Sequence, residues 1–285
     1  MDWLDCLNDA IKYIEEHLED EIDIERVSKI ACCSTYHFQR IFSYIADISL
    51  SEYIRRRRMS KAAVDIQNGN CKIIDIALKY GYDSPTAFNR AFHSIHGIAP
   101  SKAKKEGIVL RAYPPISFKI TIKGDTEMNF RIEKKEAFKI VGIKEHYSRG
   151  IEESFLKVPL FWGKAHQDGI IPKLCSLMNK DPFGILGVCS SASSQDFDYY
   201  IAVATDKETP AGMEEFIIPE ATWAIFECIG AMPDAIQTLQ KRIITEWLPT
   251  SGYEYANAPD IELYFEGEQT AEDYKCEVWL PVIKK

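Results

Sequence analysis

The stretch IALKYGYDSPTAFNRAFHSIHG, residues 76–97, decides the fold of the N-terminal part, because an earlier segment repeats its pattern. Phe-x-Arg-x-Phe stands at residues 38–42 and again, fifty residues later, at 88–92. In each copy, apolar residues at helical spacing are interrupted by a short turn, which in the second copy contains Gly81. Ser34 and Ser84 stand where an N-cap would start the next helix. We therefore expect two helix-turn-helix motifs.

The second helix of each motif has a polar face opposite its apolar residues. This face includes Gln39 and Arg40 in the first copy, and Asn89 and Arg90 in the second. Arginine pairs with guanine edges, glutamine and asparagine pair with adenine edges, and all of them donate to phosphates. A helix with such a face fits the major groove of DNA. The alternative is an ordinary helical bundle with polar outer faces.

Charge is distributed unevenly along the chain of 285 residues, whose formal net charge is −9. Residues 1–25 hold ten acidic side chains and one basic side chain, whereas residues 26–105 hold fourteen basic and five acidic side chains. The repeated segment thus has nine surplus positive charges, and residues 106–285 have nine surplus negative charges. A basic module beside an acidic domain is typical of a protein that binds a polyanion. The pattern favours DNA binding over a plain bundle.

Residues 24–105 resemble the DNA-binding domain of the AraC/XylS family of bacterial transcription regulators. The resemblance rests on Phe38-Gln39-Arg40-Ile41-Phe42, Tyr53-Ile54, Arg58-Met59, Ala62, Ile76-Ala77, Gly81-Tyr82, Ser84-Pro85, Phe88-Asn89-Arg90-Ala91-Phe92, Gly97 and Pro100. It implies seven helices, in which a long linker helix, here residues 51–68, holds two recognition helices apart. One such domain reads two adjacent major-groove segments.

The same resemblance implies roles for individual positions. Carried over by position, the candidates that face bases are Tyr36, Gln39, Arg40, Thr86, Asn89 and Arg90. Arg55, Arg56 and Arg57 are expected near backbone phosphate, whereas Arg58 stands where the family often has a structural arginine.

Two positions depart from the family pattern. Cys32 stands where the first copy should have its turn glycine. Ala103 stands where an aromatic residue is expected after Pro100-Ser101-Lys102. We expect the turn to accept the cysteine or to change its geometry, and the end of the domain to pack differently.

Strand and helix patterns alternate in the acidic half. The expected strands are residues 138–143, 183–190, 199–205, 222–229, 260–265 and 275–282, and the expected helices are 151–166 and 233–248. They form two β-α-β-β repeats, which predict an α+β sandwich with helices on one face of antiparallel strands. We expect the opposite, concave face to hold a ligand. Residues 106–129, with an alternating run at 116–123, are predicted to lead into an edge strand.

The sequence therefore predicts a multidomain protein with two parts. Residues 1–108 form an all-α N-terminal domain with two helix-turn-helix motifs, and residues 109–285 form an α+β C-terminal domain built from two β-α-β-β repeats.

The acidic half resembles the gyrase-inhibitor-like (GyrI-like) effector-binding domain. The resemblance covers most of residues 112–285 and rests on Trp223-Ala224-Ile225-Phe226, Gly230, Glu246-Trp247-Leu248-Pro249, Ser251-Gly252-Tyr253, Asp260-Ile261-Glu262-Leu263-Tyr264 and Leu280-Pro281-Val282. It implies an aromatic-lined cleft with a buried acid that binds hydrophobic, often cationic, small molecules. Glu262 falls at the ligand-facing glutamate, with an exposed strand carboxylate as the alternative. Candidate walls are Tyr147, Phe161, Trp162, Trp223, Tyr264 and Trp279, and core packing is the alternative for each.

Motifs of other functional classes are missing from the sequence. It has no nucleophile elbow, no zinc motif with histidine, no phosphate loop, and no Cys-x-x-Cys pair among its eight cysteines. It also has neither an apolar run of spanning length nor a signal-peptide pattern at its start. We therefore expect a cytoplasmic protein that is not an enzyme and needs no cofactor or metal.

The function that these patterns predict is that of a one-component transcription regulator. Its expected partners are double-stranded DNA at a promoter or operator and a small-molecule effector, with RNA polymerase as a further candidate and no membrane. The effector is expected to be hydrophobic, with a cation as the candidate form. The alternative is a small-molecule sequestering protein or a hydrolase of the GyrI-like class, whose helical domain serves as a tether.

Overall fold

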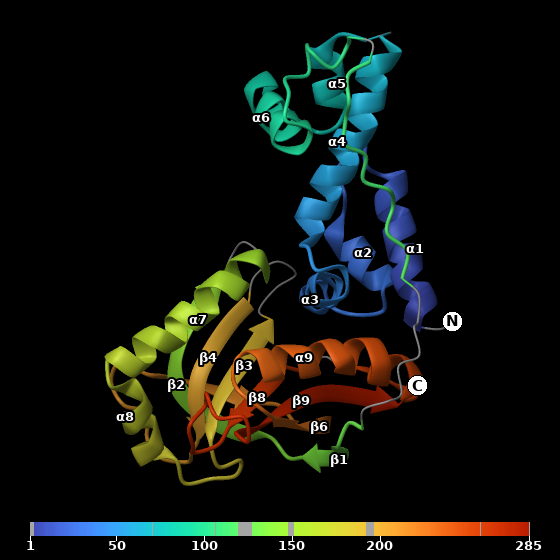
Figure 1. Ribbon diagram of the computed structural model, residues 1–285. Coiled ribbons are helices and arrows are strands. Elements are labelled where there is room, and N and C mark those ends of the chain that lie inside the picture. The colour runs from blue at the N-terminus through green and yellow to red at the C-terminus, as the bar shows by residue number, and fades with distance from the viewer. Residues whose placement is uncertain are drawn as a thin grey trace. The chain divides into compact units, whose positions relative to one another are not determined.

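The computed structural model of the chain describes residues 3–69, 71–105, 107–118, 127–147, 151–191, 197–256 and 258–284; residues 151–156 and 191 are described by their backbone alone. The chain forms two compact units, Met1–Lys119 and Ile120–Lys285. The first is helical and the second is built on a sheet, as Figure 1 shows. The predicted fold class, an all-α part followed by an α+β part, is confirmed at this level. No helix of the described residues is long and apolar enough to cross a membrane.

The helical unit contains both helix-turn-helix motifs. Its helices are α1 (Trp3–Glu16), α2 (Ile24–Ile30), α3 (Thr35–Ala46), α4 (Leu50–Asn68), α5 (Ile73–Lys79) and α6 (Pro85–His96). Helix α4 joins the α1–α3 group at one end to α5 and α6 at the other (Figure 1). The side chains of Ser34 and Ser84 accept hydrogen bonds from the backbone N–H groups of His37 and Ala87, so both predicted N-caps are present.

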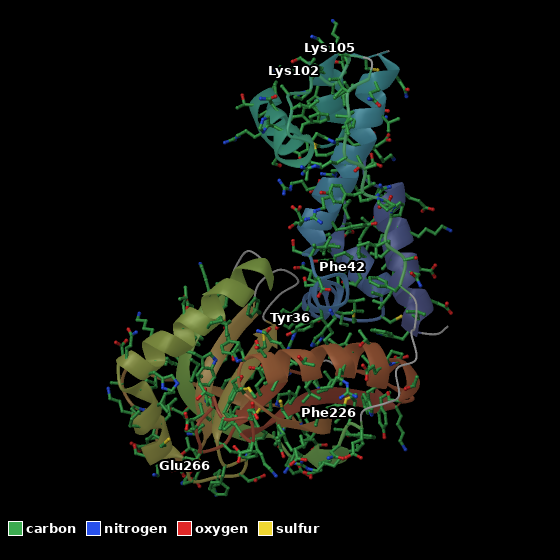
Figure 2. All side chains as sticks on the ribbon, in the orientation of Figure 1. Tyr36, Phe42, Lys102, Lys105, Phe226 and Glu266 are labelled. Carbon is green, nitrogen blue, oxygen red and sulfur yellow. The ribbon has the colours of Figure 1, made fainter. Side chains whose placement is uncertain are left out.

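Each helix-turn-helix motif has its own core. Phe38 and Phe42 are fully buried in the first, and Phe88 and Phe92 are fully buried in the second. Figure 2 labels Phe42 on α3. The two phenylalanines of each copy stand four residues apart and therefore share one helix face. Residues 101–105, where the resemblance implies a last helix, form turns, and Ala103 is buried among the core residues of the second motif.

Residues 107–118, here named the strap, run without helix or strand over the helical unit. The backbone N–H of Arg111 donates to Nδ1 of His96 on α6 at 3.2 Å, and that of Tyr113 donates to the Ser60 hydroxyl on α4 at 3.0 Å. Asn8 on α1 exchanges two hydrogen bonds with the backbone of Phe118. The strap therefore fastens onto three helices. The alternating run at 116–123 lies largely outside the described residues.

The second unit is a nine-stranded antiparallel sheet with the order β1-β6-β9-β8-β3-β4-β2-β5, and β7 pairs with β9 off this path. Its strands are β1 (Phe130–Lys135), β2 (Phe138–Tyr147), β3 (Ile185–Ser191), β4 (Phe197–Ala204), β5 (Glu214–Ile218), β6 (Ala221–Ile229), β7 (Tyr253–Tyr255), β8 (Asp260–Tyr264) and β9 (Lys275–Lys284). Its helices are α7 (Ile151–Gln167), α8 (Ile170–Leu177) and α9 (Asp234–Arg242), followed by a π-helical turn at Ile243–Trp247 and a 3₁₀ turn at Leu248–Thr250.

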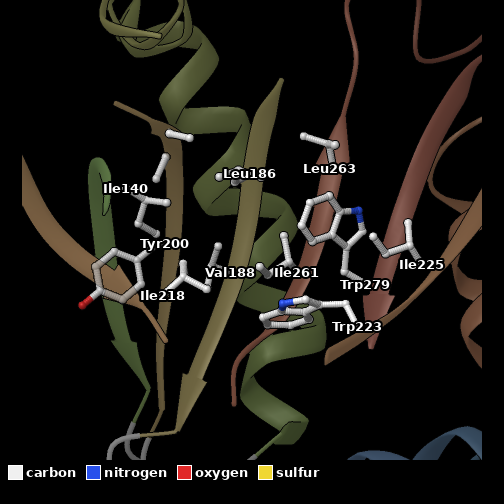
Figure 3. Close-up of a cluster of buried hydrophobic side chains, with 12 residues drawn as sticks. Ile140, Leu186, Val188, Tyr200, Ile218, Trp223, Ile225, Ile261, Leu263 and Trp279 are labelled. Carbon is white, nitrogen blue, oxygen red and sulfur yellow. The ribbon is translucent and has the colours of Figure 1, made fainter. Parts of the chain in front are cut away.

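Side-chain alternation separates the two faces of this sheet. On β8, Glu262 and Tyr264 face the helices, because Glu262 accepts a hydrogen bond from Gln240 of α9. Ile261 and Leu263 face the other side, where they join a cluster of buried side chains that includes Trp223 and Trp279 (Figure 3). The face opposite the helices, which the sequence led us to expect as the ligand face, is therefore filled by a hydrophobic core.

Candidate DNA-binding face and effector site

The outer face of α6 is exposed. Thr86, Asn89 and Arg90 are all exposed, and they lie away from the buried Phe88 and Phe92. The Ser84 cap and Pro85 at the first position determine where α6 begins. The 3.6-residue period of the helix then places Thr86, Asn89 and Arg90 on the side away from the phenylalanines.

Helix α3 presents the corresponding positions of the first motif. Tyr36, Gln39 and Arg40 are half-buried, and Phe38, Ile41 and Phe42 form the buried side of the helix. The guanidinium of Arg40 lies 5.5 Å from the ring centre of Tyr44, one turn further along. The two helices thus carry the predicted arginines, Arg40 and Arg90, at matching positions. Figure 2 shows Lys102 and Lys105 at the end of the unit that carries α5 and α6, where they add positive charge.

The arginines of α4 divide into two pairs. Arg55 and Arg56 remain partly exposed, and both bind the carboxylate of Glu52 at 2.5 Å. Burial alone would raise the pKa of Glu52, but the hydrogen bonds from Arg56 and Arg55 lower it below its usual value. Arg55 also donates to the Ser94 hydroxyl on α6 at 2.8 Å. Arg55 thus links α4 to α6, whereas the guanidinium of Arg56 lies 4.9 Å from the ring centre of Tyr113 in the strap.

Arg57 and Arg58 point into the helical unit. Arg57 forms a two-point ion pair with Glu15 of α1 at 2.7 and 2.8 Å, and it also donates to the carbonyl oxygen of Tyr113 in the strap. Its side chain is only 12% exposed. The sequence places Arg57 near phosphate, and the structure corrects this by assigning it to the packing of α1 and the strap on α4. Arg58 donates to the carbonyl oxygens of Leu18 and Asp20, which fits the expected structural role.

Glu262 is the centre of a hydrogen-bonded group on the helix side of the sheet. Its Oε2 accepts from the hydroxyls of Tyr199 on β4 at 3.1 Å and of Tyr264 at 3.0 Å. Its Oε1 accepts from Nε2 of Gln240 on α9 at 2.7 Å. The indole Nε1 of Trp162 on α7 donates to the Tyr199 hydroxyl at 3.0 Å, and its ring meets Tyr264 edge-on with centroids 5.1 Å apart. Two helices and two strands thus converge on one carboxylate.

Gly187 makes this convergence possible. It lies on β3 directly opposite Glu262 of β8, and β3 separates β8 from β4. Tyr199 on β4 can reach Glu262 only by crossing β3. A Cβ atom at Gly187 would overlap the Tyr199 hydroxyl and lie 3.2 Å from Oε2 of Glu262. Glycine within a strand commonly marks such a close approach.

The two phenols remain hydrogen-bond donors. The pKa of Tyr199 lies well above its usual value because the phenol is buried and because Glu262 is near. Burial and Glu262 raise the pKa of Tyr264 in the same way. The carboxylate is therefore held by neutral donors and flanked by aromatic rings. Such a site suits a cation with apolar groups, through charge and cation–π contact.

The structure brings together only some of the predicted wall residues. Trp162 and Tyr264 contact the Glu262 group, whereas Trp223 and Trp279 lie in the core on the opposite face of the sheet. Tyr147 is buried and stacks on Phe197 with centroids 4.9 Å apart, on the face that Tyr199 shares. Phe161 is buried on α7 beside Trp162.

Three site residues were missed by sequence reasoning, namely Gly187, Tyr199 and Gln240. A weak signal existed for two of them. Gly187 interrupts the apolar first part of its strand, and Gln240 stands one helical turn after Ile236, on the apolar face of α9. Tyr199 stands beside Tyr200, and only the pairing of β4 with β3 shows which of the two faces the helices. The described residues contain no group of three or more His, Cys, Asp or Glu side chains placed to hold a metal ion.

Comparison with known proteins gives matches to both units. A family described as the GyrI-like small molecule binding domain matches residues 128–283, and a helix-turn-helix domain family matches residues 27–106. The HTH-type transcriptional activator AarP of Providencia stuartii is 37% identical over 95 residues, which cover 33% of this chain and 70% of AarP. The transcriptional regulator Rob of Salmonella typhimurium is 24% identical over 303 residues, which cover 99% of each chain.

A solved structure also resembles the sheet unit. It is of a protein bound to tetraphenylphosphonium, and its TM-score to this chain is 0.51 with 30% sequence identity. The match covers 55% of this chain and 94% of that one.

Proposed function

The chain belongs to the AraC/XylS family of transcription regulators and carries a GyrI-like small-molecule binding domain, and we propose that it reads a DNA site with α3 and α6 and responds to a lipophilic cation bound at Glu262. The relatives named above are regulators, and we propose that this protein acts without catalysis. We also propose that it works in the cytoplasm, where it meets promoter DNA and RNA polymerase, which is a further candidate partner.

The matched outer faces of α3 and α6 carry the DNA part of the proposal. Arg40 and Arg90 stand fifty residues apart at the same position of two helix-turn-helix motifs. Tyr36 and Gln39 accompany Arg40, and Thr86 and Asn89 accompany Arg90. An arginine that binds a guanine edge at two points contributes about 1–3 kcal/mol to discrimination between bases. Arg55 and Arg56 are proposed to add contacts to phosphate.

Arg40→Ala and Arg90→Ala should each weaken specific DNA binding by about 1–3 kcal/mol, since each variant loses one base contact. We would measure fluorescence anisotropy on a duplex from upstream of the coding region and on a scrambled duplex, over a range of salt concentrations. Lys173→Ala, which removes an exposed positive charge from α8, is the matched control. Wild-type affinity in both arginine variants would remove α3 and α6 from the DNA interface.

The Glu262 group carries the effector part of the proposal. A carboxylate held by two phenols and one amide, with the Trp162 indole alongside, offers charge and aromatic surface to the same ligand. The protein whose solved structure resembles this unit binds tetraphenylphosphonium, a cation with four aromatic groups. We propose that a cation of this class enters on the helix side of the sheet.

The strand pairing supports the interpretation of this unit as two β-α-β-β repeats. In one half β2 and β3 pair with β4, and in the other β6 and β8 pair with β9. The two halves meet where β3 pairs with β8, and Gly187 and Glu262 face each other at that pairing. We propose that the effector binds at the seam between the repeats.

Glu262→Gln should weaken binding of tetraphenylphosphonium by about tenfold to a hundredfold, because it keeps the side-chain shape and removes the charge. Isothermal titration calorimetry with the full chain measures this effect. The control is Glu266→Gln, which removes an exposed carboxylate in the loop after β8 (Figure 2). This variant should bind the cation as the wild type does. Equal affinity in Glu262→Gln and the wild type would contradict the assignment.

A further inference from the structure

Three thiols lie together at the turn between α2 and α3. Cys6 projects from α1 and is buried, whereas Cys32 in the turn is exposed. Their Sγ atoms are 3.3 Å apart. Cys33 follows directly and is near enough to both for their charges to affect its thiol. The turn before the first recognition helix therefore holds two adjacent sulfur atoms, one of which solvent can reach.

The second helix-turn-helix motif shows what this turn requires. Both turns close alike, because the N–H of Cys33 donates to the carbonyl oxygen of Ser28 at 3.1 Å and that of Tyr82 donates to Ala77 at 3.0 Å. The residue before each donor is left-handed, with φ +56° at Cys32 and +78° at Gly81. Glycine adopts this conformation freely, whereas any side chain strains it. Residues held in a strained backbone conformation cluster at functional sites, which makes the Cys32 thiol a candidate for a role of its own.

The geometry suits a bond between Cys6 and Cys32. A disulfide is about 2.05 Å long, so the two sulfur atoms must approach by about 1.2 Å from their separation of 3.3 Å. The exposed Cys32 can meet a small oxidant, and the buried Cys6 lies where it can complete the reaction. Burial and the neighbouring Cys32 and Cys6 raise the pKa of the Cys33 thiol, which keeps it protonated and less reactive.

We propose that Cys6 and Cys32 form a reversible disulfide by exchange with a low-molecular-weight disulfide, and that this bond weakens DNA reading by α3. The Cys32 thiolate attacks one sulfur of the small disulfide, forms a mixed disulfide and releases one small thiolate. The Cys6 thiolate then attacks the Cys32 sulfur and expels the second small thiolate. Two protein thiols are oxidised, one small disulfide is reduced to two small thiols, and those thiols take up the two protons.

The new bond would act on α3 through its N-cap. Ser34, two residues after Cys32, caps α3 by accepting a hydrogen bond from the N–H of His37 at 3.2 Å. Drawing the turn toward α1 displaces this cap and the first turn of the helix, where Tyr36 lies. This consequence rests on the proposed function, because it assumes that α3 faces DNA.

The bond itself is tested by peptide mapping of the full chain after incubation with glutathione disulfide and alkylation of free thiols. Trypsin should then release residues 1–12 linked to residues 30–40. Cys33→Ser should keep this link, Cys32→Ser and Cys6→Ala should lose it, and Cys6→Ala should retain glutathione on Cys32. Cys71→Ser, which removes an exposed thiol elsewhere in the unit, is the control. Alkylated Cys6 in the oxidised wild type, or a link that survives Cys32→Ser, would overturn the proposal.

The effect on DNA reading is tested by anisotropy with the same samples. We expect the oxidised wild type to bind the upstream duplex at least fivefold more weakly than the reduced protein, and dithiothreitol to restore binding. Oxidation should leave the affinity of Cys32→Ser unchanged, because this variant forms neither the link nor a glutathione adduct in the turn. Unchanged affinity in a wild type shown to carry the bond would overturn the regulatory effect. If the reduced protein does not distinguish the upstream duplex from the scrambled one, the proposed function fails, and the peptide map still decides whether the disulfide forms.

Discussion

At the residue scale, the hydrogen-bonded group around Glu262, our proposed effector site, depends on the absence of a side chain at Gly187. The hydroxyl of Tyr199 occupies the space that a side chain at this position would take, and from there it donates to Glu262. Tyr264 donates to the same carboxylate oxygen, Oε2, so a displaced Tyr199 would disturb the whole group. A residue with no side chain therefore contributes directly to the shape of the site.

Gly187→Ala should weaken tetraphenylphosphonium binding by tenfold or more and lower the free energy of unfolding by about 1–3 kcal/mol, because the added methyl group overpacks the site. Calorimetry and chemical denaturation measure the two effects. Gly163→Ala on α7 is the matched control, since a Cβ there meets no atom within 4 Å and alanine favours a helix. Wild-type binding in Gly187→Ala would mean that Tyr199 is not part of the site.

At the element scale, the strap depends on a neutral histidine. His96 accepts from the backbone N–H of Arg111 through Nδ1, so its proton is on Nε2, which donates to the carbonyl oxygen of Met59 at 3.1 Å. Burial lowers the pKa of His96, and the nearby charge of Arg111 lowers it further, although the bond to Met59 acts in the opposite direction. Protonation of Nδ1 would break the bond to Arg111 and release the strap from α6.

The stability of the chain should therefore fall as the solution becomes acidic. A histidine whose pKa is lower in the folded than in the unfolded state stabilises the protein above the unfolded value of about 6.5, and this contribution is lost as the pH falls through the folded value. Chemical denaturation between pH 5 and 8 measures the slope. The His96→Asn variant should flatten this slope. The His93→Gln variant, which replaces an exposed histidine on the same helix, should keep the wild-type slope. An unchanged slope in His96→Asn would assign the pH dependence to other groups.

At the scale of the whole molecule, regulation requires that the two binding events are coupled. A ligand shifts a conformational equilibrium only by its difference in affinity for the two states, and the coupling is reciprocal. DNA bound to the helical unit and a cation bound at Glu262 must therefore change each other's affinity by the same factor.

We expect tetraphenylphosphonium to change the affinity for the upstream duplex by about 5- to 150-fold, and the duplex to change the affinity for the cation equally. Anisotropy titrations at several cation concentrations, and calorimetry with and without DNA, measure the two factors. Glu262→Gln should reduce both. A cation that binds tightly but leaves DNA affinity unchanged would make this unit a sequestering module rather than a sensor.

The sequence by itself determined what depends on neighbours along the chain. The caps at Ser34 and Ser84 and the apolar faces at Phe38 and Phe88 follow from the helical period and from local hydrogen bonds. The strand expected at residues 260–265 is likewise present, as β8 at Asp260–Tyr264. For this reason the helix-turn-helix repeat, the α+β half and the position of Glu262 in a strand could be predicted.

Only the tertiary structure decided what depends on distant partners. Arg55 and Arg57 have the same chemistry in the sequence, yet Glu15 and the strap draw Arg57 inside while Arg55 stays partly exposed. Trp223 and Trp279 look like site residues until the register of their strands places them on the opposite face. Strand pairing joins residues far apart in the chain, and a shift of one residue exchanges the two faces, so no local pattern determines which side chains meet.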